Sequence, residues 1–137
     1  MKQESQTEPS TQVCPFSGHN PSLSAEEKAA AGFVAVNYID CKPHYQERFE
    51  CLFCTRARAI DRMEGFIGMH VLKCHKEGEP YLVVSYWKDE ASFNAWVGSP
   101  EFLEGHKRGF EDLAEAKRRG EEPPMTSDFK TYSILTD

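Results

Sequence analysis

The segment Phe33–Ile39, with the sequence FVAVNYI, constrains the fold more than any other part of the chain. Successive side chains of an extended strand point to opposite faces, and here both faces are largely apolar. Such a strand is stable only where both faces are shielded from water. The chain is therefore expected to place this segment inside a sheet that is covered on two sides.

The remaining elements follow from periodicity and from capping residues. Apolar residues recur at helical spacing from Tyr45 to Ile60, and Pro43 suits the first helical position. Asp89 is expected to cap a short helix, and Ser99 a longer one that runs to about Arg119. The further predicted strands are 66–74 and 81–87, which form a hairpin across 76–80, and 129–135.

The resulting order is β-α-β-β-α-β, which predicts an α+β, ferredoxin-like split βαβ fold. Its four-stranded antiparallel sheet carries the helices on one face only. Val34, Val36 and Tyr38 point to the other face, where residues 82–86 alternate in a similar way. A second copy of the sheet would cover this face and form a dimeric α+β barrel, although partial exposure is the alternative.

Composition limits the classes of partner. The chain has 137 residues, which suits a single domain, and its 16 Lys+Arg against 22 Asp+Glu give a net charge of -6. Nucleic acid is therefore not an expected partner. No apolar run reaches the roughly 20 residues that cross a bilayer, and no signal-peptide pattern begins the chain, so we expect a cytoplasmic protein that does not bind membranes. Residues 1–30 are polar and Pro-containing and are predicted to be a flexible arm before a domain over 31–137.

The five cysteines do not form the framework of a small secreted domain, so reduced thiols are expected. Cys51 and Cys54 have CxxC spacing, but they lie in a helical pattern without a preceding strand or a second CxxC, and they are expected to be unreactive. Cys14-Pro15, followed by His19, resembles the short Cys-Pro motif of some haem-responsive proteins. A chance match is the simpler explanation of so short a motif.

Asn37 and His106 are polar residues on otherwise apolar faces. Asn37 shares its strand face with Phe33, Ala35 and Ile39, and an unpaired buried amide costs about 1–3 kcal/mol. Bonding to nearby backbone is the structural explanation, and projection into a ligand cavity is the functional one. His106 lies in the helical stripe of residues 102, 103, 110 and 113, where a satisfied core histidine is the structural alternative.

Two glycines flank His106 and favour the functional explanation. Gly105 and Gly109 each cost helix stability and permit the close approach of a flat group. An imidazole directed into an apolar cavity suits an axial ligand of haem iron. Trp96, ten residues earlier on the short helix with Phe93, is expected either to anchor the core or to join Asn37 and His106 in one site.

Several stretches between Phe33 and Leu135 resemble the IsdG-type haem-degrading monooxygenases of the antibiotic-biosynthesis monooxygenase superfamily. The clearest are Asn37, residues 63–69 (MEGFIGM), residues 87–96 (WKDEASFNAW), and Phe102 with the Gly105-His106-Lys107 step. In that family the functional Trp lies ten residues before the His, which assigns the role to Trp96 and leaves Trp87 structural.

The resemblance implies a haem site and a reaction. His106 would be the axial ligand of the haem iron, Asn37 a distal hydrogen-bond donor, and Trp96 the residue that distorts the macrocycle, with Gly105, Gly109 and Phe93 lining the site. Haem would be both cofactor and substrate, and molecular oxygen with an external electron donor, a reductase or a small reductant, would open the ring and release iron.

Two other functions remain open from the sequence. A cofactor-independent oxygenase of the same superfamily would use the three residues to orient a quinol or polyphenol and to stabilise a developing anion. A haem-binding sensor or store, to which Cys14-Pro15 contributes, would bind haem without degrading it.

Overall fold

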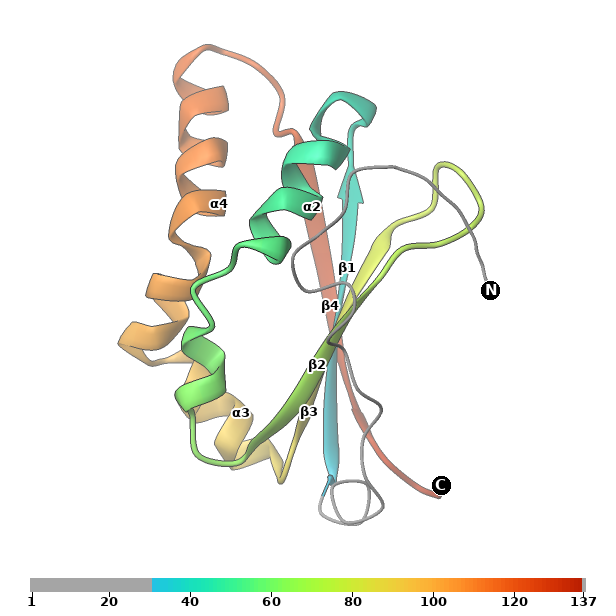
Figure 1. Cartoon of the computed structure of the whole chain (residues 1–137), viewed down its shortest axis with the longest axis vertical. Coiled ribbons are helices and arrows are strands. Elements are labelled where there is room, and N and C mark those ends of the chain that lie inside the picture. Colours follow the sequence, from blue (N-terminus) through green and yellow to red (C-terminus); the bar gives the residue numbers. More distant parts are fainter. Residues whose placement is uncertain (1–30, 137) are drawn as a thin grey trace.

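The computed structural model describes residues 31–136, which form one antiparallel sheet with helices on a single face (Figure 1). The four strands run in the order β2-β3-β1-β4 across the sheet. They are β1 (Phe33–Cys41), β2 (Phe66–Leu72), β3 (Tyr81–Trp87) and β4 (Met125–Ser133). The predicted α+β, ferredoxin-like fold is thereby confirmed. The predicted arm over 1–30 and the Cys14-Pro15 motif lie outside the described residues.

Local capping signals place the helices that cover the sheet. The Asp89 carboxylate accepts a hydrogen bond from the Ser92 backbone N–H at 2.9 Å, and the Ser99 hydroxyl accepts one from the Phe102 backbone N–H at 3.2 Å, so both residues cap helices as predicted. The helical elements are η1 (Pro43–Tyr45), α2 (Gln46–Cys54), η2 (Ala59–Arg62), α3 (Glu90–Val97) and α4 (Pro100–Arg118). None of these helices is long and apolar enough to cross a membrane.

The prediction of one helix over 45–60 is wrong. Helix α2 ends at Cys54, and the chain turns through Arg58, whose φ of 61° is left-handed, before η2 begins. Arg108 on α4 donates hydrogen bonds to the carbonyl oxygens of Leu52 at 3.1 Å and Thr55 at 2.9 Å. These carbonyls end the helix without intrahelical partners, and a residue far along the chain satisfies them.

Two strand boundaries and one cysteine also differ from expectation. Strand β4 begins four residues earlier than predicted because Met125 pairs with Cys41 at the end of β1. Strand β2 ends at Leu72, two residues before the predicted end of this strand at Cys74. Cys54 is disulfide-bonded, which contradicts the expectation of reduced thiols for this residue.

The core between the helices and the sheet consists of two separate clusters. The first surrounds Trp87, which is 0% exposed, and contains Phe33, Ala35, Ala59, Phe93 and Trp96. The second consists of Ile39, Tyr45, Phe49 and Tyr81. Asn37 lies on β1 between Ala35 of the first cluster and Ile39 of the second. The sheet therefore has a gap in its apolar packing at the position of Asn37.

The face of the sheet opposite the helices is apolar as well. Val36 and Val84 are buried on it, while Val34, Tyr38 and Leu82 are partly exposed. At the edge of the sheet, every residue of β4 after Met125 is exposed, including Tyr132. This surface matches the predicted apolar face that a second copy would cover.

Candidate functional site

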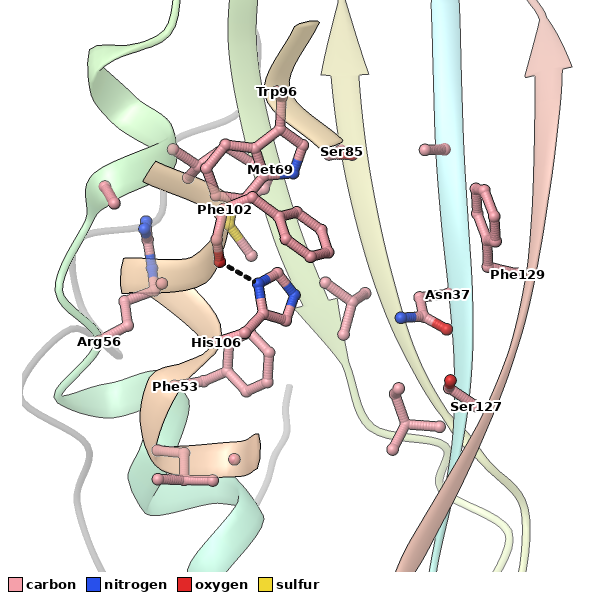
Figure 2. Close-up of a pocket in the computed structure, with 18 of the residues that line it drawn as sticks. Asn37, Phe53, Arg56, Met69, Ser85, Trp96, Phe102, His106, Ser127 and Phe129 are labelled. Atoms are coloured by element: carbon pink, nitrogen blue, oxygen red, sulfur yellow. Dashed lines mark hydrogen bonds between the residues drawn. The ribbon is translucent and has the colours of Figure 1, made fainter. Parts of the chain in front are cut away.

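A cavity of about 720 Å³ fills the gap between the two core clusters. Its floor is the sheet, with Asn37 on β1, and its opposite wall is α4, with His106. In Figure 2 these two side chains face each other across the open space. Phe93, Trp96, Gly105 and Gly109 also line the cavity, so the structure brings together every residue that the sequence proposed for the site.

Asn37 supplies a polar group to this floor without a protein partner. Its carbonyl oxygen Oδ1 is buried and accepts no hydrogen bond from the described residues. Figure 2 shows the amide nitrogen directed toward His106. The structural explanation, in which nearby backbone satisfies the amide, is therefore not the one observed. Instead, the side chain has unused hydrogen-bonding capacity in the cavity.

His106 is held in one orientation by its own helix. Its Nδ1 lies 2.7 Å from the carbonyl oxygen of Phe102, one turn earlier, so Nδ1 carries the proton as the donor. The imidazole stacks between Phe102, with ring centroids 4.1 Å apart, and Phe110, at 5.3 Å. Nε2 is then left with a free lone pair, and in Figure 2 it faces the sheet.

The surroundings of His106 also favour its neutral form. Burial lowers the pKa of His106 below its usual value, against the smaller opposing effect of the hydrogen bond to Phe102. A neutral imidazole with a fixed Nδ1 proton and an accessible Nε2 is the form that binds a metal ion or accepts a proton. The geometry thus suits His106 either as a ligand of iron or as a general base.

Trp96 packs against α4 in a way that explains Gly105. It is 6% exposed, and its ring centroid lies 6.0 Å from His106 and 5.3 Å from Phe102. A Cβ at Gly105 would lie 3.4 Å from the Trp96 ring, so the flat group that approaches this glycine in the structure is the indole. A Cβ at Gly109 would lie 3.6 Å from Met125. Both glycines bring neighbours close to the cavity wall.

Large apolar side chains with exposed surface surround the cavity. Phe129 on β4 is 54% exposed, and Val97 and Phe110 are similarly accessible. Phe129 also contacts Phe93, with ring centroids 5.9 Å apart. Exposed aromatic groups around a cavity are typical of a site for a large apolar ligand. In contrast, Leu103 was expected in the inward stripe of α4, but it is 62% exposed and does not line the cavity.

Sequence reasoning missed the other polar residues that line the cavity, which are Arg56, Arg58, Ser85, Arg108, Ser127 and Asp128. Ser85 follows the alternation that places Trp87 on the same strand face, so its direction was predictable, but its burial was not. Arg56 and Arg108 come from the turn after α2 and from α4. No local pattern indicates their approach, because the turn after α2 was not predicted.

Known proteins resemble this chain in both sequence and fold. A family model described as antibiotic biosynthesis monooxygenase matches residues 32–108. A Mycobacterium tuberculosis protein named haem oxygenase (mycobilin-producing) is 33% identical over 67 residues, which cover 49% of this chain and 64% of the relative, less than two thirds of its length. A Staphylococcus epidermidis haem oxygenase (staphylobilin-producing) is 34% identical over 77 residues, 55% of this chain and 73% of the relative.

Two solved structures show the breadth of the fold. The haem degrader MhuD from Mycobacterium tuberculosis, with two haems bound in its active site, has a TM-score of 0.56 and 26% identity over 77% of this chain and 97% of that one. SnoaB, a cofactor-independent oxygenase from Streptomyces nogalater, has a TM-score of 0.57 and 21% identity over 79% of this chain and 97% of that one, a likeness of fold alone. The family model covers more than half of the sequence and the fold agrees with it, so the chain belongs to the antibiotic biosynthesis monooxygenase family, as its resemblance predicted.

Proposed function

We propose that this protein is a haem-degrading monooxygenase that uses haem as both cofactor and substrate, opens the porphyrin with molecular oxygen and releases the iron. The observation that carries the proposal is the oriented, neutral His106 imidazole opposite the unpartnered Asn37 amide. The relatives named haem oxygenase support this choice of ligand. Electrons would come from an external donor, a reductase or a small reductant.

The residues of the cavity fit haem. His106 Nε2 has a free lone pair and would hold the haem iron, which needs only one nitrogen ligand from the protein. The remaining wall is largely aromatic and apolar, which suits the porphyrin face. The Asn37 amide, whose Oδ1 has no partner among the described residues, could donate a hydrogen bond from Nδ2 to a small ligand held in the cavity.

Each residue then has a definite task. His106 would hold the iron through Nε2, while its protonated Nδ1 donates to the Phe102 carbonyl oxygen and so fixes the ring. Asn37 donates a hydrogen bond from Nδ2 to the ligand opposite. Trp96, buried against α4, would form a rigid wall beside the bound haem. Bound haem supplies the iron that activates oxygen and the meso carbon that is oxidised.

An optical haem titration of the full chain, followed by reduction in air with catalase present, tests this function. We expect a saturable Soret band that bleaches after reduction. His106→Ala should shift or abolish the band, whereas His44→Ala, which changes an exposed histidine on η1, should match the wild type.

Other outcomes of the titration would reject the proposal. A band that stays stable after reduction in air would indicate a haem sensor or store. Absence of a specific band would favour a cofactor-independent oxygenase acting on a quinol or polyphenol, in which His106 is a general base.

A further inference from the structure

Ser85 is the one polar residue that is buried within the part of the chain that the structure describes, at 7% exposure. It lies in the middle of β3, paired with Ala35 on β1 and Met69 on β2, on the face of the sheet that bears the helices. Its side chain lines the cavity, beside the strand that carries Asn37 (Figure 2). A buried hydroxyl at this position requires an explanation.

The contact with Trp87 uses the Ser85 hydroxyl as an acceptor but not as a donor. The indole Nε1 of Trp87 donates to Ser85 Oγ at 2.9 Å, and this bond satisfies a donor that has no access to water. The bond uses one lone pair of Oγ and leaves the hydroxyl hydrogen free to be donated. No acceptor for that hydrogen is found in residues 31–136. Because the indole occupies one side of Oγ, the hydrogen is directed elsewhere.

Ser85 and Asn37 are diagonal neighbours on the cavity floor. Asn37 pairs with Val83, and Ser85 lies two residues further along β3, so both side chains point into the same space. Diagonal positions of an antiparallel pair lie about 7–8 Å apart, within reach of two side chains that share one small ligand. The floor therefore presents an amide and a hydroxyl, each with unused hydrogen-bonding capacity.

We propose that Ser85 is a second hydrogen-bond donor of the site, which contacts the small acceptor ligand bound opposite His106 together with Asn37. The ligand class is a diatomic molecule or small anion whose outer atom accepts hydrogen bonds, such as oxygen or cyanide. Trp87 acts as a positioning residue, because its indole N–H fixes the side of Oγ from which the hydrogen is donated. This inference rests on the proposed haem function.

The test separates the ligand contact from the bond to Trp87. Full-length Trp87→Phe and the double variant Trp87→Phe/Ser85→Ala both lack the indole N–H, so they differ only in the hydroxyl. Each is loaded with ferric haem and titrated with cyanide, and the C–O stretching frequency of the ferrous carbonyl complex is recorded. Ser85→Thr in the wild-type background retains a hydroxyl, and Ser133→Ala removes an exposed hydroxyl on β4 that does not line the cavity.

We expect the double variant to bind cyanide about three- to tenfold more weakly than Trp87→Phe, which is the loss of one hydrogen bond. Its C–O stretching frequency should rise, because a donor to the ligand is lost. Ser85→Thr and Ser133→Ala should stay close to the wild type. Equal cyanide affinities and C–O frequencies in Trp87→Phe and the double variant would overturn the inference and leave Ser85 as a partner of Trp87 alone. Failure of the wild-type chain to bind haem would instead overturn the proposed function, and this inference with it.

Discussion

The buried carbonyl oxygen of Asn37 has no hydrogen-bond partner among the described residues, and such a group costs about 1–3 kcal/mol of stability. The residues beside it on the same strand face, Ala35 and Ile39, are apolar and buried. An apolar residue at position 37 would therefore suit the fold better than the amide does. A function that requires the amide accounts for its presence.

Asn37→Leu tests this reasoning. The variant keeps a side chain of similar size and removes the unpaired carbonyl, so the free energy of unfolding should stay equal or rise by about 1 kcal/mol. Haem-dependent turnover should fall in the same variant. Chemical denaturation and a turnover assay on one preparation check both parts, and a loss of more than about 2 kcal/mol in stability would show that the amide supports the fold.

The pKa of His106 makes stability depend on pH. Because burial lowers this pKa in the folded chain, the unfolded chain binds more protons at mildly acidic pH. The contribution of His106 is therefore fully present above the usual histidine pKa, near 6.5, and is lost as the pH falls toward the folded value. Denaturation between pH 8 and 5 should show that the free energy of unfolding declines less, as the pH falls, for His106→Gln than for the wild type. Parallel curves for the two proteins would contradict the neutral, buried imidazole.

Among the helices and strands, the boundaries that could be predicted from the sequence are those set by residues close to them in the chain. Helices α3 and α4 begin at Asp89 and Ser99 as expected, because each cap bonds within three residues. The end of α2 was missed because its carbonyls are satisfied by Arg108 from α4. The extra length of β4 follows from pairing with β1, which no local signal reports.

Arg108→Met tests the contact that ends α2. The guanidinium also donates to the Thr55 hydroxyl at 2.9 Å, so the variant leaves several groups at the end of α2 without their donor. We expect the free energy of unfolding to fall by about 1–3 kcal/mol. Arg119→Met is the matched control, since its ion pairs with Glu115 and Glu121 lie on the surface and contribute about 0–1 kcal/mol. Equal stability of the two variants would contradict the role of Arg108.

At the scale of the whole molecule, the sequence predicted the fold class and placed the candidate residues on the helix-facing side, but it left open whether they line a cavity. Alternation placed Asn37 on the helix-facing side, and helical spacing placed His106 inward. The separation of the core into two clusters depends on how α2, η2 and α4 pack together, which a pattern along the chain does not report. The structural alternatives for Asn37 and His106 therefore stayed open until the packing was known.

The apolar face opposite the helices leads to a prediction of oligomeric state. We propose that two copies pair through this face, and Leu82 lies on it between Tyr38 and Leu72. Sedimentation should give the mass of a dimer for the wild type and of a monomer for Leu82→Glu, because a charge buried between two sheets is costly. Leu103→Glu, on the exposed side of α4, should remain dimeric. A monomeric wild type would contradict the proposed pairing.

Ring opening of haem in this cavity, as proposed, would be seen in the mass of the tetrapyrrole product. The haem-loaded full chain is reduced in air with catalase present, extracted, and examined by mass spectrometry beside His106→Ala. We expect a linear tetrapyrrole that contains added oxygen atoms, free iron in solution, and no such product from the variant. Recovery of intact haem from the wild type after complete reduction in air would contradict it.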